Sequence, residues 1–106
     1  EKMGDFELVI LVNEYSASAT EIVSAALQDN KAATIVGTTT FGKGVMQEIL
    51  PIFNKTAALK ITIEEFKTPN GNKINKVGIT PDVEVELDST SNADTQLQKA
   101  IELLSK

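Results

Sequence analysis

The chain of 106 residues contains neither cysteine nor histidine. Without cysteine there is no disulfide framework and no thiol nucleophile, and without histidine there is no Ser-His-Asp triad and no histidine-based metal site. A serine nucleophile in this chain would need another base, and lysine is the usual substitute. The search for chemistry therefore turns to serines and lysines.

Long apolar runs and excess positive charge are lacking too. The longest apolar run, residues 8–12, is far too short to cross a bilayer, and residues 1–4 lack the basic flank and apolar core of a signal peptide. Acidic residues outnumber basic ones by 15 to 10 and the lysines are scattered, so nucleic acid is not an expected partner. The chain can bury one modest core, which predicts one domain or less.

The first 36 residues predict a βαβ unit. Residues 6–12 form a nearly continuous apolar run, typical of a parallel strand covered on both faces. Residues 33–36 predict a second short strand. Between them, apolar residues recur at helical spacing and would share one face; they are Ala19, Ile22, Val23, Ala26 and Leu27.

The rest of the chain predicts more strands and a last helix. Residues 37–44 form a loop rich in glycine and threonine, and residues 45–53 resume a strand composition. Residues 59–64 alternate apolar and polar, which predicts a half-buried strand with one face in solvent. Turn residues at 69–72 precede a short strand near residues 83–85. The last helix would align Ala93, Leu97, Ala100, Ile101 and Leu104.

A first candidate site lies at residues 15–21, where small and hydroxyl-bearing residues join a buried strand to a helix. Open α/β sheets place reactive groups beyond the carboxyl ends of their strands, and the free N–H groups of a helix N-terminus can stabilise an oxyanion. Ser18 is thus a candidate nucleophile. Ser18 and Glu21 also have the spacing of a capping box, which stabilises helix ends in many inactive proteins. Local sequence leaves both interpretations open.

A second candidate site is Lys43. Residues 37–43 match the phosphate-loop pattern G-x-x-x-x-G-K, but Gly44 replaces the Mg²⁺-binding Ser or Thr. The next residues predict a strand instead of the helix that such a loop opens, so nucleotide binding is disfavoured. As a neutral amine, a form that burial or nearby positive charge favours, Lys43 is a candidate base, and the flanking glycines would let its backbone approach the serine. The alternative is a lysine in a solvated loop.

Five separated motifs together resemble the carboxyl-terminal processing (tail-specific) protease family. They follow one another in register at residues 13–21, 28–29, 37–47, 66–71 and 78–82, and the similarity runs from about residue 8 to residue 85. The resemblance implies an α/β fold with a ClpP/crotonase-like partial core, βαβ units, a mixed sheet and a C-terminal helix. It implies a serine-type endopeptidase that cleaves protein substrates near their C-termini by acyl transfer.

The same resemblance assigns roles to single residues. Ser18 would be the nucleophile and Lys43 its general base, with Gln47 positioning the lysine. The backbone amide of Ala19 would be one donor of the oxyanion hole. No cofactor, metal or nucleotide is implied.

The resemblance further implies that residues 1–106 are the C-terminal portion of a catalytic domain whose PDZ domain and N-terminal part are absent. The isolated chain should be nearly inactive, because a second oxyanion donor lies upstream and losing one such donor costs about 10²- to 10³-fold in rate. The implied partner is a protein or peptide substrate, and the implied location is extracytoplasmic. A membrane anchor on the parent and homo-oligomerisation stay open. The alternative function is a non-catalytic peptide-binding or scaffold relative of the same fold.

Overall fold

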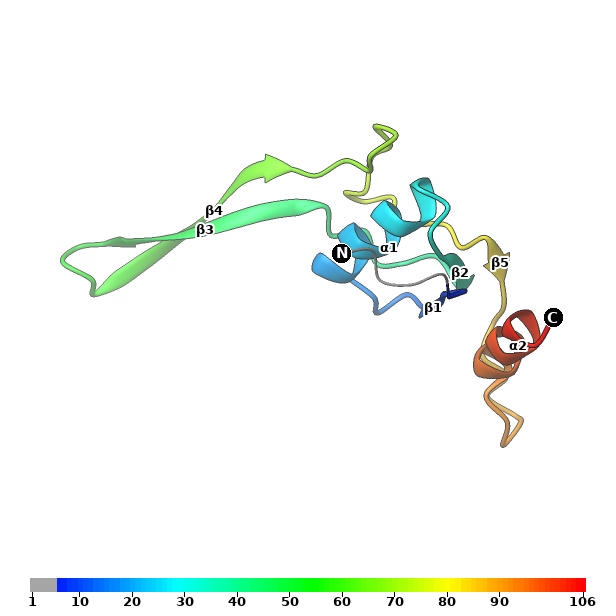
Figure 1. The fold of residues 1–106 in the computed structure, drawn as a ribbon. Coiled ribbons are helices and arrows are strands. Elements are labelled where there is room, and N and C mark those ends of the chain that lie inside the picture. The colour runs from blue at the N-terminus through cyan, green and yellow to red at the C-terminus, as the bar shows by residue number, and fades with distance from the viewer. Residues whose placement is uncertain (1–5) are drawn as a thin grey trace.

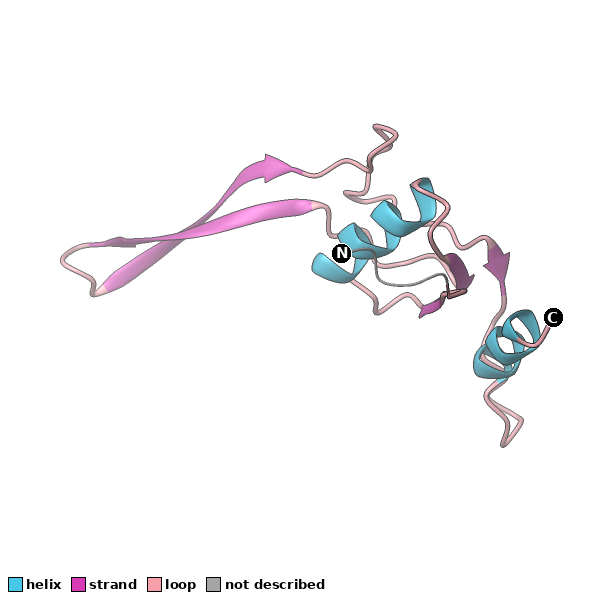
Figure 2. Cartoon of the chain, in the orientation of Figure 1, coloured by secondary structure: helices cyan, strands magenta, loops and turns pink. Residues whose placement is uncertain are grey.

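The computed structural model describes residues 6–106. The described residues form five strands and two helices in the predicted order, so the α/β class is confirmed. Figures 1 and 2 show their arrangement. The elements are β1 (Val9–Val12), α1 (Ala19–Asp29), β2 (Thr34–Gly37), β3 (Val45–Ile52), β4 (Ala57–Glu65), β5 (Val83–Glu84) and α2 (Thr95–Leu104). Neither helix is long and apolar enough to cross a membrane in this part of the chain.

The body of the molecule is built on a parallel sheet in the order β1-β2-β5. The βαβ unit is confirmed, because β1 and β2 pair in parallel across α1. The central strand is β2, in which Ile35 and Val36 are fully buried. The prediction that β1 is covered on both faces is wrong for the described residues. No strand within residues 6–106 pairs with its outer edge, and Leu11 is 39% exposed.

The other two strands form an antiparallel hairpin that extends away from the body (Figure 1). Ile49 pairs with Lys60 on one face, and Leu50 pairs with Leu59 on the other. A register shift between Met46 and Gln47 interrupts the ladder near the body. The prediction that one face of β4 is buried is wrong here, because no described element covers either face of the outer hairpin.

Neither helix buries the whole face that the apolar periodicity predicts, although Ala100 of the predicted α2 face is buried. The buried side chains of α1 are Glu21, Ser24 and Ala25, whereas Val23 is 55% exposed. In α2, Gln96 and Ala100 are buried, while the predicted apolar residues Leu97, Ile101 and Leu104 are exposed. The reason for α1 is that its inner face meets backbone amides and small side chains. Its apolar stripe is half-buried at Ala26 and Leu27 and exposed at Ile22 and Val23.

Segments far apart in the sequence are held together behind α1. The Gln28 side chain donates to the Thr80 carbonyl and to Asp82 Oδ1, both at 3.0 Å. Asp29 Oδ2 accepts from the Asn70 amide at 2.8 Å, and Asp82 Oδ2 accepts from the Ile35 amide at 2.8 Å. A small core of Ala25, Ile74 and Ile79, with Phe66 against it, fills the space between. These contacts bring residues 66–82 against the loop that carries Lys43.

Candidate active site

Ser18 begins helix α1 in a strained backbone conformation. Its φ is 58° and its ψ is −119°, a region that side-chain-bearing residues rarely occupy. Such a conformation costs of order 1–3 kcal/mol and is found mostly where function requires it. A sharp turn between a strand and a helix also exposes the side chain at its apex. The structure thus presents Ser18 at the carboxyl end of the sheet, as expected.

The amide of Ala19 is free to receive a ligand. The amides of Glu21 and Ile22 bond to the Ser18 carbonyl at 2.9 and 3.1 Å, whereas the Ala19 amide donates no hydrogen bond to any described residue. First-turn amides of a helix lack intrahelical partners and carry the positive end of the helix dipole. This amide therefore has the chemistry that the predicted oxyanion donor needs.

The loop of Lys43 packs tightly against residues 74–78. A Cβ atom on Gly44 would lie 2.4 Å from the Asn75 amide nitrogen, and the Gly42 carbonyl accepts from the Lys76 amide at 2.8 Å. Gly42 has a φ of +86°, which favours glycine. The two glycines therefore serve the approach of residues 74–78. We expected the glycines to bring the backbone of Lys43 toward Ser18, but their close contacts are with residues 74–78.

The carboxylate of Glu21 joins the two candidate catalytic loops. Oε2 accepts from the amides of Ser18 at 2.9 Å and Lys43 at 2.8 Å. Oε1 accepts from the Gly42 amide at 2.6 Å and the Thr40 hydroxyl at 2.5 Å. Glu21 is fully buried. The backbones at residues 18 and 43 are thus held by one side chain.

Burial alone raises the pKa of the Glu21 carboxyl, but hydrogen bonds from the Thr40 hydroxyl and from the amides of Gly42, Lys43 and Ser18 outweigh it. The net effect lowers this pKa below its ordinary value, so the group is a carboxylate at neutral pH. The Glu21 half of the predicted capping box forms, because its carboxylate accepts from the Ser18 N–H, whereas the Ser18 side chain makes no capping hydrogen bond. Capping does not compete with a nucleophilic role, because the carboxylate uses the Ser18 N–H and not its hydroxyl. Sequence reasoning saw only the cap.

Ser18 and Lys43 line one open cavity of about 360 Å³ where the hairpin meets the body. Ala19 and Gln47 line it too. The four predicted site residues are therefore brought together. Lys43 is exposed in this chain, so described residues do not bury it. The Gln47 side chain donates to Thr62 Oγ1 at 3.4 Å and has no bond to Lys43 among residues 6–106.

A larger hollow, of about 550 Å³, lies between the start of β1, the connection from α1 to β2 and the end of α2. None of the predicted site residues lines it. The predicted site residues therefore meet in the smaller cavity, which brings together a strained serine, a lysine and a free amide.

Comparison with known proteins agrees with this geometry. The sequence profile of Peptidase family S41 matches residues 2–85. The chain belongs to this family. The resemblance of the five motifs to the carboxyl-terminal processing protease family is confirmed, because relatives of this chain carry that name. One, from Synechocystis sp., is 43% identical over 99% of this chain and 26% of its own length. Another, the chloroplastic carboxyl-terminal-processing peptidase 3 of Arabidopsis thaliana, is 49% identical over 73% of this chain and 15% of its own.

Solved S41-like structures confirm the fold. The photosystem II D1 C-terminal processing protease superposes with a TM-score of 0.73 and 34% identity, over 94% of this chain and 25% of that chain. The tricorn protease superposes with a TM-score of 0.74 and 28% identity, over 92% of this chain and 10% of that chain. These proteins share a ClpP-like fold, so the predicted ClpP/crotonase-like partial core is confirmed. The chain spans about a quarter or less of the length of these relatives.

The described part of the S41 chain shows neither a candidate metal cluster nor the helix that a phosphate loop opens. Within residues 6–106, no group of three His, Cys, Asp or Glu side chains could hold a metal ion. The loop at residues 37–44 opens onto strand β3 and not onto a helix, as the sequence predicted. The helix N-terminus that a phosphate loop requires is therefore missing from this position.

Proposed function

We propose that this chain carries the nucleophile and general base of a serine endopeptidase that cleaves protein substrates near their C-termini. One observation carries the proposal. A single buried carboxylate, Glu21, accepts hydrogen bonds from the amides of both Ser18 and Lys43, and both residues line one cavity. Membership of peptidase family S41 supports a protease.

The proposed reaction is acyl transfer. Neutral Lys43 removes the proton from Ser18 Oγ while that oxygen attacks the peptide carbonyl. The resulting Lys43 ammonium protonates the leaving amine, and water then hydrolyses the Ser18 ester. The Ala19 amide stabilises the oxyanion, and Gln47 orients the lysine. No metal or cofactor takes part.

We also propose that residues 1–106 are the C-terminal portion of the catalytic domain of a longer protein. The exposed Lys43 supports this, because a neutral amine is favoured by burial that residues 6–106 do not supply. The missing cover, the second oxyanion donor and a PDZ domain would come from other segments. On its own the chain would be nearly inactive. An extracytoplasmic location, a membrane anchor and homo-oligomerisation rest on the family resemblance.

The test uses the complete protein and an unstructured protein such as casein as substrate. Ser18→Ala and Lys43→Ala should each lower turnover by at least about 10²- to 10⁴-fold, because each removes a group that acts on the reacting atoms. Thr20→Ala and Lys67→Ala are matched controls at exposed neighbouring positions and should stay active. Circular dichroism checks that every variant is folded.

Two outcomes would overturn the assignment. If a folded Ser18→Ala or Lys43→Ala variant keeps near-parental turnover, that residue lacks its proposed role. If the parent protein binds peptides but never cleaves them, the non-catalytic relative is the correct description.

A further inference from the structure

The cavity beside Ser18 carries only positive charge. Lys43 and Lys60 both line it, and no Asp or Glu is among its described lining residues. The contrast with the whole chain is sharp, because acidic residues exceed basic ones by 15 to 10. The catalytic proposal explains Lys43 but leaves Lys60 unexplained.

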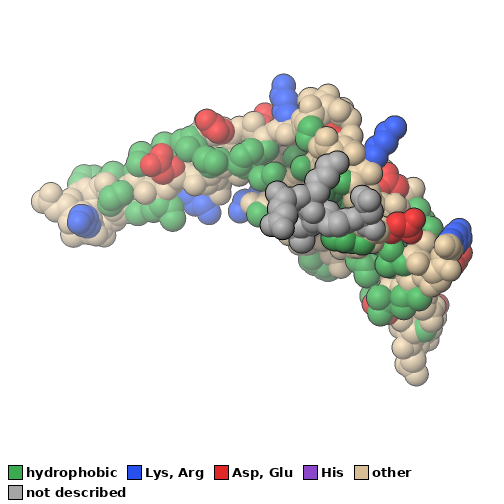
Figure 3. Space-filling model, in the orientation of Figure 1, with side chains coloured by type: hydrophobic (Ala, Val, Ile, Leu, Met, Phe, Trp, Pro, Cys, Tyr) green, Lys and Arg blue, Asp and Glu red, His purple; other side chains and the backbone are tan. Residues whose placement is uncertain are grey.

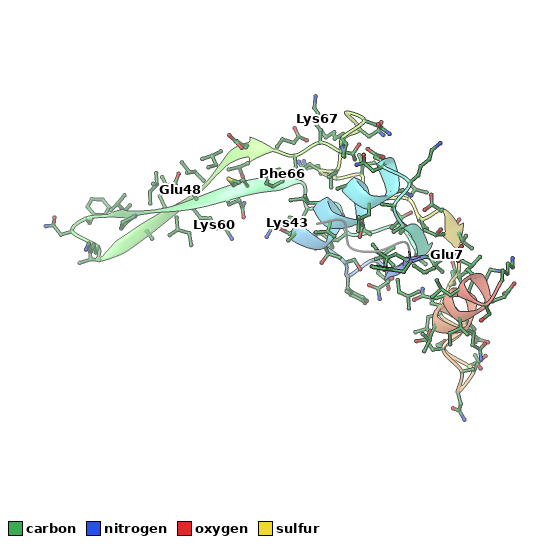
Figure 4. All side chains as sticks on the ribbon, in the orientation of Figure 1. Glu7, Lys43, Glu48, Lys60, Phe66 and Lys67 are labelled. Atoms are coloured by element: carbon green, nitrogen blue, oxygen red, sulfur yellow. The ribbon has the colours of Figure 1, made fainter. Side chains whose placement is uncertain are left out.

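Strand pairing explains how Lys60 reaches this cavity. It lies opposite Ile49 on β4, on the hairpin face that also presents the pair of Gln47 and Thr62. The acidic residue Glu48 alternates onto the other face. Figure 4 shows Lys43 and Lys60 directed into the same space beside the hairpin, with Glu48 on the opposite side.

Lys60 also has no carboxylate partner among residues 6–106. The ion pairs in this part of the chain are Lys73 with Glu65 at 3.2 Å and Lys99 with Glu102 at 3.0 Å. When Lys43 acts as a neutral base, Lys60 is the remaining cation of the cavity. An ammonium placed there attracts an anion from outside the chain.

The rest of the cavity wall suits an apolar side chain. Ile22, Met46, Ile49 and Phe66 line it, and they come from α1, β3 and the segment after β4. A peptide that covers these residues would exclude water from the cavity. Exclusion of water strengthens the attraction between an ammonium and a carboxylate.

We propose that Lys60 is a specificity-determining residue that binds a carboxylate of the peptide substrate, while the neighbouring apolar wall holds an adjacent apolar side chain. The inference rests on the proposed function, since it assigns a substrate class to the same cavity. The carboxylate comes either from an acidic side chain near the cleaved bond or from the free C-terminus of the substrate. Both sources present the same chemistry to Lys60.

The experiment compares pairs of fluorogenic peptides on the complete protein. In one set, Glu replaces Gln at each of about three positions on either side of the cleaved bond; in the other, a free C-terminus replaces an amide. The parent protein should favour one carboxylate-bearing peptide by about tenfold in kcat/KM, the ratio that one charge-assisted hydrogen bond supplies. The peptide set in which the preference appears shows whether the carboxylate belongs to an acidic side chain or to the free C-terminus.

Variants of Lys60 decide whether that residue causes the preference. Lys60→Met keeps the apolar stem and should reduce the preference to about twofold or less, while Lys60→Glu should reverse it. Lys67→Met is the control, because Lys67 points away from the cavity in Figure 4, and it should leave the preference intact. Added NaCl should shrink the preference of the parent but not that of Lys60→Met.

Binding to the Ser18→Ala background separates this inference from the proposed function. Fluorescence anisotropy of the same peptides should show the carboxylate preference with Lys60 and its loss with Lys60→Met. If turnover depends on Ser18 but neither turnover nor binding distinguishes the peptide pairs, or if Lys60→Met keeps the distinction, the role of Lys60 is wrong and the peptidase assignment stands. If no Ser18-dependent turnover exists, the peptidase assignment fails and the binding assay still decides the role of Lys60.

Discussion

Four hydrogen-bond donors from two separate loops converge on the carboxylate of Glu21. At the scale of single residues, this is the feature that sequence reasoning could not reach. Ser18 and Lys43 were identified by their motifs, but a glutamate at the third position of a helix is the ordinary partner of an N-cap. Nothing local shows that amides at residues 42 and 43 will point at it. An acidic residue on an inner face that otherwise carries the small residues Ser24 and Ala25 is the only signal.

Glu21→Gln should disable the site without removing the helix. The amide NH₂ of glutamine cannot accept the N–H groups that now bond to the carboxylate, so at least one buried donor loses its partner. The expected cost is about 1–3 kcal/mol in stability. We expect a loss of turnover of at least about tenfold, because the backbones of Ser18 and Lys43 separate. Thermal unfolding and casein turnover of the complete protein measure the two effects. Unchanged turnover would show that Glu21 does not position the pair.

The contribution of Glu21 to the stability of the fold should depend on pH. Because the folded pKa lies below the ordinary value of 4.5, the stabilisation is fully present above that pH. It is lost as the pH falls from there through the lowered folded pKa, since protonation removes the charge that the four donors hold. Unfolding midpoints of the parent and Glu21→Gln, recorded between about pH 3 and 6, should converge at the acid end. A difference between the two unfolding midpoints that stays constant across this pH range would contradict the lowered pKa of Glu21.

Gly44→Ala should displace Lys43, because the added methyl would meet the Asn75 amide nitrogen at 2.4 Å. A shift of about 1 Å at a catalytic group can cost about 10²-fold in rate. Gly71→Ala is the matched control. Its φ of +86° makes alanine strained by about 1–2 kcal/mol, but no atom lies within 4 Å of the new methyl. Casein turnover should fall only for Gly44→Ala; equal activity of both variants would contradict this account.

At the scale of elements, periodicity located the strands and helices but misjudged what covers them. Apolar runs and helical spacing are local properties, so β1, α1, β2, β3 and α2 lie within a few residues of expectation. Whether a face of a helix or strand is buried depends on which other segments pack against it. The stripe with Ile22 and Val23 was expected inside, yet the inner face of α1 carries Glu21 and Ser24. Glu21 occupies that face because it bonds to backbone from another loop, a contact that no local pattern encodes.

At the scale of the whole molecule, the chain exposes more surface than a folded domain of its size. Its accessible area is 7697 Å², whereas roughly 5,800 Å² is expected for a monomer of 11.4 kDa. Its radius of gyration is 17.3 Å, against about 13 Å for a compact domain. Apolar side chains run along the hairpin in Figure 3. These values support the proposal that other segments of a longer protein cover this surface.

The isolated chain should therefore self-associate. Leu50 and Leu59 pair on the hairpin face away from the cavity, and both are exposed. Replacing both by serine should shift the chain toward monomer in sedimentation velocity, because it removes apolar area that association would bury. Ala58→Ser lies on the other face and is the control. If the isolated chain without substitutions sediments as a stable monomer, the view that much of its core is missing is wrong.

The bridge at Glu21 also bears on when the proposed enzyme can act. Its carboxylate gathers residues 18 and 43 only after the chain has wrapped the lysine loop onto α1. In a chain that is still being synthesised, or in one unfolded by heat, Ser18 and Lys43 are not held next to each other. We expect such a chain not to cleave other proteins. Digestion can begin only in a molecule that has finished folding.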